Sequence, residues 1–385
     1  MNHAEFFAAY DGFGERRAGL AGDVASAAWL RDLAVQAGAE AALVPVPFQR
    51  FVPGEAFLDV AGRRIEGLPL FDGGVTDTAG ITGTLGPLGS DATIGVVEME
   101  PRAASLPGNP FAQARAASRH AAIIVALRTQ PDSLAPLNAH DTEAPFGPPV
   151  LQVAGREGPG LVALAAQGST TARLVACGVK APATSFNIRA SLPGGATPPL
   201  VLLTPRTSWW TSTAERAGGV LAWVEALHAL AAVPATQRRH VVALANCGHE
   251  LGHIGAHQAF AREPALASDA ALVIHLGANL GVAEDARLTV RSNVPGIADR
   301  MAEAMVAAGH PRAPLEVVTG GKANGEAHEI EARGGRYLSL IGHNPWFHAP
   351  EDRWPGTIDL QNATAIATAV ARMAVEFAKI APASG

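Results

Sequence analysis

The stretch 249–253, HELGH, carries a dense set of side chains able to do chemistry. Its two histidines, with a glutamate after the first, match HExxH, the pattern with which one helical face holds a zinc ion beside a general base. A helix is not expected here, because the motif follows an apolar, strand-like segment and glycines stand at 248, 252 and 255. We therefore predict a turn, and keep the helical zinc motif as the minor alternative.

Other polar clusters also follow apolar segments that are typical of buried strands. The expected strands are 199–205, 240–248, 271–281 and 336–342. The polar clusters are 206–208, 246–250 and 343–348. Helical patterns alternate with the strands, which predicts an α/β fold with a mostly parallel sheet flanked by helices. Functional groups collect beyond the carboxyl ends of such strands, so we expect these clusters to form one site.

A block from about 71 to 180 differs from the rest of the chain. It is rich in Gly, Thr and Ala, with short strand patterns and helical patterns near 111–119 and 158–167. It is predicted to be a small inserted α/β domain, within a catalytic domain made of 1–70 and 181–385. The length of 385 residues also favours two domains.

Composition excludes several classes of protein. Apolar residues make up 48% and charged residues 17%, which indicates a globular chain with a large core. The net charge of −6 argues against nucleic-acid or anionic-membrane partners. Two cysteines are too few for a disulfide framework. Neither a signal peptide nor a long apolar run is present in this sequence, so a cytoplasmic protein is expected.

The order of motifs resembles metallopeptidase family twenty-eight, which contains zinc aminopeptidases and has glutamate carboxypeptidase, transferrin receptor and glutaminyl cyclase as relatives. GHELGHIGAHQAF at 248–260 is similar to the family signature G-E-E-x-G-L-L-G-S-x-x-F, and FHAPED at 347–352 to an aromatic followed by H-T-P-x-D. PRTS at 205–208 and AERAGG at 214–219 stand where the family has His-x-Asp and Asp-Asn-Ala-Ser-Gly. The block at 71–180 resembles the family's protease-associated insert. The resemblance covers nearly the whole chain, in order.

The resemblance implies an altered metal site. One zinc of the family would be held by Glu215, Glu250 and His348, a set of two carboxylates and an imidazole that suits zinc. Arg206 and Gly277 stand where ligands of the other zinc are expected, and neither can bind a metal. This implies a single zinc ion, or none. An alignment shifted by two positions would restore a ligand, since His275 would then take the place of Gly277.

Catalytic roles follow from the same comparison. His249 stands where the family has its general base, and a neutral imidazole can accept a proton in the same way. Arg206 would supply the positive charge of the missing zinc and favour a substrate with a carboxylate, or else form a structural ion pair with Glu215 or Glu250. Further residues are candidates for substrate binding or as added donors. They are Ser208, Trp209, Trp210, His253, His257, His275, His328 and His343.

We therefore predict a hydrolase or acyl-transfer enzyme that acts on a small amide or short peptide-like substrate. Two alternatives stay open. One is a catalytically inactive homologue that acts as a binding module, because two metal ligands and the usual base are replaced. The other is a metal-independent enzyme that uses His249, Arg206 and Glu250.

Overall fold

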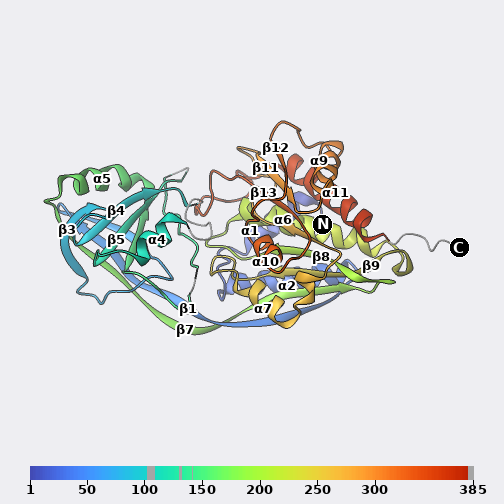
Figure 1. Cartoon of the computed structure of the whole chain (residues 1–385), viewed down its shortest axis with the longest axis horizontal. Helices are drawn as coiled ribbons and strands as arrows, with labels where there is room; N and C mark the ends of the chain where they lie inside the picture. The colour runs from blue at the N-terminus through green and yellow to red at the C-terminus, as the bar shows by residue number, and fades with distance from the viewer. Residues whose placement is uncertain (102–108, 130–131, 141, 380–385) are drawn as a thin grey trace.

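The chain forms two lobes joined by a pair of long strands (Figure 1). The structure is a computed structural model and describes residues 1–101, 109–129, 132–140 and 142–379. Strands β1 (Glu40–Val60) and β7 (Thr171–Leu192) pair antiparallel over most of their length and pass from one lobe into the other. The register of this pairing shifts between Pro53 and Ala56.

The smaller lobe contains β2–β6 with helices α4 and α5. Its elements are β2 (Arg63–Pro69), β3 (Ile81–Pro87), β4 (Ile94–Met99), α4 (Pro110–Ala116), β5 (Ala122–Leu127), β6 (Val150–Ala154) and α5 (Gly158–Gln167). Strands β2 to β6 connect the distal parts of β1 and β7, so that seven strands close a ring. Ala56, Leu58, Val60 and Ile65 pack into this lobe's hydrophobic core although they precede position 71.

The larger lobe is built on the sheet order β1-β7-β9-β8-β10-β13-β11-β12. The remaining strands are β8 (Ala196–Pro205), β9 (Arg239–Asn246), β10 (Leu272–Leu276), β11 (Leu288–Ser292), β12 (Leu315–Thr319) and β13 (Tyr337–Gly342). The four neighbours β9, β8, β10 and β13 run parallel, and the outer pairings β7–β9 and β11–β13 are antiparallel. The expected α/β fold with a parallel-centred mixed sheet is confirmed.

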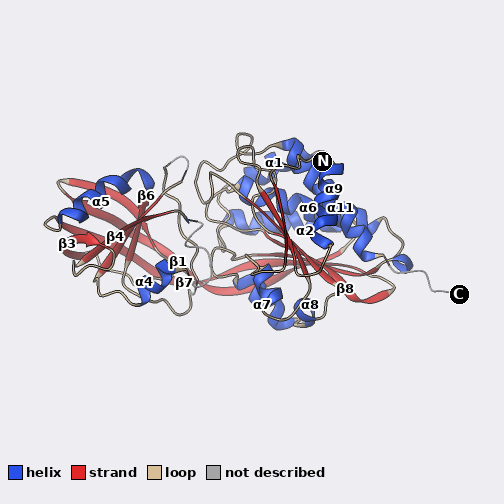
Figure 2. Cartoon of the chain, turned by 45° about the horizontal axis from the view of Figure 1, so that its top comes forward, coloured by secondary structure: helices blue, strands red, loops and turns tan. Residues whose placement is uncertain are grey.

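Helices cover both faces of this sheet (Figure 2). They are α1 (His3–Gly12), α2 (Ala21–Gln36), α6 (Thr213–Ala231), α7 (Ile254–Arg262), α8 (Ala265–Ser268), α9 (Ile297–Ala307), α10 (Ala327–Glu331) and α11 (Leu360–Ala378). Leu200 and Leu202 of β8 belong to the core under α1, α2, α6, α9 and α11, whereas Val201 and Leu203 belong to the core under α7, α8 and α10. This alternation follows from the two-residue period of a strand, and it explains why the central strands are apolar throughout.

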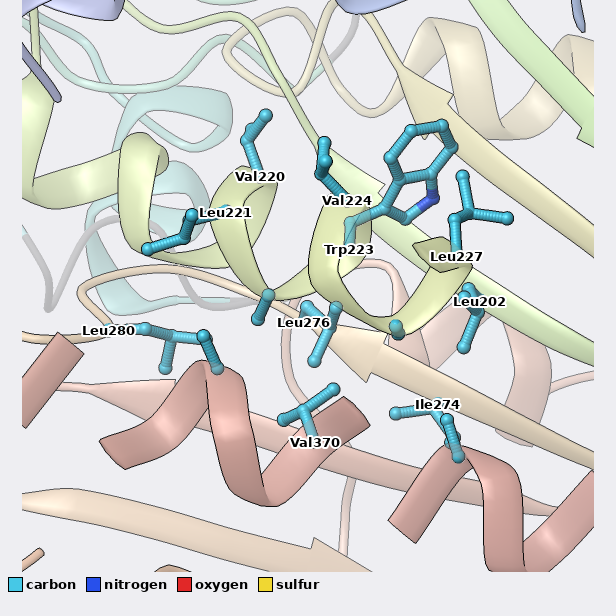
Figure 3. Packing of buried hydrophobic residues seen from close by; sticks show 14 of the residues in the cluster. Leu202, Val220, Leu221, Trp223, Val224, Leu227, Ile274, Leu276, Leu280 and Val370 are labelled. Atoms are coloured by element: carbon cyan, nitrogen blue, oxygen red, sulfur yellow. The ribbon is translucent and has the colours of Figure 1, made fainter. Parts of the chain in front are cut away.

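Helix α6 is the buried centre of the larger core. Val220, Trp223 and Leu227 on this helix belong to the same hydrophobic core as Leu202 of β8, Leu276 of β10 and Val370 of α11 (Figure 3). Gly218 of the same helix approaches Leu280 so closely that a Cβ there would lie 1.7 Å from the Leu280 carbonyl oxygen. None of the helices within the described ranges is long and apolar enough to cross a membrane.

Candidate active site

The HELGH segment lies in a glycine-rich turn between β9 and α7. Gly248 and Gly252 have φ values of 68° and 72°, and His253 also adopts the left-handed conformation at 60°. A Cβ on Gly252 would lie 2.4 Å from the carbonyl oxygen of His140, so the close approach requires glycine as well. Helix α7 begins only at Ile254, so the expected turn is confirmed and the helical zinc motif is wrong.

The turn nevertheless brings both histidines to one acidic side chain. Glu326 precedes α10, and its Oε1 lies 2.8 Å from Nδ1 of His249. Ligand atoms of His249, His253 and Glu326 all lie within 4.8 Å of one another, and no other group of three or more His, Cys, Asp or Glu residues in the described ranges does so. Two imidazoles and one carboxylate with an open side form a known catalytic zinc set.

His275 supports this cluster from strand β10. Its Nε2 lies 3.3 Å from Oε2 of Glu326, and its Nδ1 lies 2.8 Å from Oγ of Ser339 on β13. Both imidazole nitrogens of this fully buried side chain are thus occupied. Such contacts fix the orientation of a carboxylate that could bind a metal ion.

The charge states in the cluster suit a metal site. Burial, with the nearby Arg216 guanidinium, lowers the pKa of His249 to about 4, so this imidazole is neutral at pH 7. Burial opposes ionisation of Glu326, but His249 and His253 outweigh it and hold the pKa of this carboxyl well below its usual range. Burial likewise opposes charge on His253, but Glu326 and Glu329 raise its pKa above the usual value. A metal ion at His253 would compete with protons for its imidazole.

The cluster opens into a cavity of about 290 Å³. Its wall contains six histidines and two glutamates, and no lysine or arginine is among the described residues that line it. These histidines and glutamates are His140, His249, His253, His257, His275, His328, Glu326 and Glu329. Glu329 holds His257, with Oε1 and Nε2 2.9 Å apart, and also pairs with Arg333 at 2.7 Å.

A second buried polar group involves Glu215 and His348, which were predicted to bind the metal. Oε1 of Glu215 lies 3.7 Å from Nε2 of His348, and Oε2 accepts a hydrogen bond from the Ser208 hydroxyl at 2.7 Å. Nη2 of Arg216 lies 2.7 Å from the same Oε1. Burial opposes ionisation of Glu215, but Arg216 and His348 outweigh it and lower the pKa of this carboxyl. None of these residues lines the cavity.

Glu250 does not join Glu215 and His348 in a common ligand cluster. Its two carboxylate oxygens accept hydrogen bonds from the Ala18 amide and the Thr207 hydroxyl, each at 2.7 Å. Burial raises the pKa of this carboxyl. This placement corrects the predicted metal set: adjacent residues in a turn point in different directions, so His249 faces the cavity while Glu250 faces the N-terminal segment.

The structure also corrects the role predicted for Arg206. Its guanidinium forms a fully buried ion pair with Asp23, in which Nη1 lies 2.6 Å from Oδ1. Nε donates to the Phe186 carbonyl oxygen at 2.9 Å, and Nη2 donates to the Ser185 hydroxyl at 3.2 Å. Arg206 does not line the cavity. The open alternative of a structural ion pair is therefore the observed arrangement, with Asp23 as partner in place of Glu215 or Glu250.

Three other candidates for substrate binding lie outside the cavity wall. Trp209 packs in a buried cluster with Phe71, and its ring makes an edge contact at 4.8 Å between centroids. Trp210 Nε1 donates to the His348 carbonyl oxygen at 2.9 Å. His343 Nδ1 lies 2.7 Å from Oδ2 of Asp285. The packing role that adjacent tryptophans commonly have is the one seen here.

Sequence reasoning missed Glu326, Glu329 and Arg216. The only signal for Glu326 was its position two residues before His328, in a segment already marked for its histidine. Arg216 stands beside Glu215 in the first turn of α6, a position where a charged residue is ordinarily solvent-exposed, but here it is 0% exposed. Its burial follows from α6 lying at the centre of the core.

A segment of the smaller lobe completes the wall of the cavity. Asn138 and His140 line it, and Ala139 donates its amide to the Glu250 carbonyl oxygen at 2.9 Å. Nδ1 of His348 lies 2.6 Å from the Pro136 carbonyl oxygen, and Trp209 Nε1 donates to the Asn138 amide oxygen at 3.0 Å. Residues far apart in the sequence and from both lobes thus form this wall.

Solved structures with the same fold are zinc aminopeptidases and related proteins. A family-twenty-eight peptidase precursor from Shewanella amazonensis superposes with a TM-score of 0.76 at 16% identity, over 98% of this chain and 93% of that one. A zinc aminopeptidase from Bacillus subtilis superposes with a TM-score of 0.74 at 18% identity, over 96% of this chain and 94% of that one. A glutaminyl cyclase from Porphyromonas gingivalis superposes with a TM-score of 0.51 at 14% identity, over 97% of this chain and 96% of that one. No protein-family profile and no curated protein sequence matches this chain. At these identities the comparisons show a zinc-aminopeptidase-like fold.

Proposed function

We propose that this protein is a hydrolase or acyl-transfer enzyme for small amide or short peptide-like substrates, with one divalent metal ion at His249, His253 and Glu326. The observation that carries the proposal is the convergence of these three side chains at the wall of the cavity. The zinc aminopeptidases and the glutaminyl cyclase of the same fold support the class of reaction. The cavity volume of about 290 Å³ supports a small substrate.

The residues present fit a metal ion at this cluster and not at the set predicted from the sequence. His249 is neutral and Glu326 is anionic, as metal ligands must be. Glu215, by contrast, already has a guanidinium against it, and Glu250 accepts hydrogen bonds elsewhere. A zinc ion at His249, His253 and Glu326 would supply Lewis acidity that polarises an amide carbonyl.

The chain's own residues perform the remaining tasks. His275 orients Glu326 through its contact at 3.3 Å. Glu329 lines the cavity, and its carboxylate is held by His257 and Arg333. No lysine or arginine is among the described residues of the wall, so the carboxylate-bearing substrate suggested by Arg206 is no longer supported. We retain the inference that the smaller lobe is a protease-associated-like domain, whose residues 138–140 limit the size of the substrate.

Metal analysis of the purified protein, combined with a panel of aminoacyl amides, tests the proposal. We expect about one equivalent of zinc, and the loss of both zinc and hydrolysis in a His249→Ala/His253→Ala variant. His257→Ala is the matched control, because His257 also lines the cavity but lies outside the three-residue cluster. Metal-free protein with full hydrolysis would favour the metal-independent enzyme, and metal-free, inert protein would favour the binding module.

A further inference from the structure

Glu215 and His348 are arranged as two ligands of a cation. Both side chains are fully buried, and the facing atoms Oε1 and Nε2 lie 3.7 Å apart. Nδ1 of His348 lies 2.6 Å from the Pro136 carbonyl oxygen, which can only accept, so Nδ1 carries the proton. In the neutral imidazole Nε2 then presents a lone pair toward Oε1 of Glu215. Two electron-rich atoms so close together require a positive charge beside them.

The positive charge belongs to Arg216. This side chain is 0% exposed, and its Nη2 lies 2.7 Å from Oε1 of Glu215. Nε donates to the Thr207 carbonyl oxygen at 2.9 Å, which holds the guanidinium in place. We infer that Arg216 is a built-in cation that closes the aminopeptidase-type metal position at Glu215 and His348 and leaves the neighbouring histidine cavity as the place for a metal ion.

The remaining polar contacts agree with this inference. The second oxygen of Glu215 is taken by the Ser208 hydroxyl, and Glu250, the third member of the predicted set, is bonded to Ala18 and Thr207. The charge of Glu215 is thus already balanced by the Arg216 guanidinium, which leaves no charge there for a metal ion to balance.

The test removes the guanidinium and asks whether zinc can replace it. Arg216→Met is prepared in the His249→Ala/His253→Ala background, so that zinc at the histidine cavity is not counted. We expect Arg216→Met to melt at a lower temperature than this background protein, because Glu215 becomes a buried charge without its partner. Zinc chloride should then raise the melting temperature of the variant by several degrees, whereas it leaves the background protein unchanged.

Two controls locate the effect. Adding His348→Gln, which keeps a hydrogen-bond donor, should abolish the stabilisation by zinc, and Arg216→Lys, which keeps the charge, should show none. A melting temperature of Arg216→Met that does not respond to zinc, or a response that survives His348→Gln, overturns the inference. If Arg216→Met does not fold, the double variant Glu215→Gln/Arg216→Met, which removes both charges of the pair, tests the pairing. Recovered folding supports the charge pairing, and continued misfolding refutes it.

Failure of the proposed function would appear in the zinc content of the proteins before any change at Arg216. In that case wild type and the His249→Ala/His253→Ala background would hold the same amount of zinc. The inference about Arg216 depends only on the comparison within that background, so the two outcomes are separate.

Discussion

His249 and Glu326 are 77 positions apart in the sequence, yet Nδ1 of the one lies 2.8 Å from Oε1 of the other. The contact joins the turn after β9 to the segment before α10. Because the Glu326 side chain is only 1% exposed, its charge needs partners within the protein. Three histidines, His249, His253 and His275, surround it and make it the central residue of the candidate site.

Glu326→Gln should weaken zinc binding by more than about tenfold, because an amide oxygen carries no charge for the ion. Isothermal titration of metal-depleted protein with zinc measures this directly. Glu329→Gln is the matched control: its carboxylate also lines the cavity, but it lies 4.0 Å from His253 and outside the ligand cluster. Equal loss of affinity in both variants would contradict the assigned cluster.

Arg206→Met should destabilise the protein by about 3–5 kcal/mol, since Asp23 would remain buried without its partner. Urea unfolding followed by tryptophan fluorescence gives this free energy of unfolding. The folded fraction should keep the turnover number of the wild type, because Arg206 does not line the cavity. A stable variant with a large loss of turnover would restore the catalytic role predicted from the sequence.

Gly218→Ala should destabilise the protein by about 3 kcal/mol or more, because the added methyl group would meet the backbone of Leu280. Gly160→Ala provides the control. It also lies in a helix, α5, but has no atom within 4 Å of the new Cβ, and should stabilise by about 0.5–1 kcal/mol. Melting temperatures that fall equally in both variants would disprove the close contact between α6 and Leu280.

Asp352 should make the stability of the protein depend on pH. Its carboxylate accepts the amides of Ala214 and Glu215 at the start of α6, and burial raises its pKa from 3.8 to about 6. A raised pKa means that the folded state holds a proton that the unfolded state has lost. Protonation of Asp352 therefore contributes fully to the free energy of unfolding below about pH 4, and this contribution is lost as the pH rises through 6.

The difference between the two pKa values of Asp352, 3.8 and about 6, corresponds to about 3 kcal/mol in the free energy of unfolding. Asp352→Asn cannot take up this proton, so its free energy of unfolding should fall less between pH 4 and pH 7 than that of the wild type. Urea titrations at several pH values measure the two slopes. Identical slopes in both proteins would rule out this titration.

The sequence by itself determined the fold class and predicted the end of the parallel strands where the candidate site lies. Val, Leu and Ile runs at 199–205 and 336–342 predict buried strands, and both are strands of the parallel centre. This worked because strand periodicity and glycine-rich turns are local properties, set by residues close together in the chain. The turn at HELGH was predicted for the same reason.

Only the tertiary structure decided which side chains meet. Glu250 and His249 are adjacent, but one accepts the Ala18 amide and the other faces the cavity. Of two arginines near the candidate site, Arg206 pairs with Asp23, and Arg216 reaches the Glu215 carboxylate. The direction of a side chain and the partner of a buried charge depend on segments far away in the sequence, and no local pattern records them.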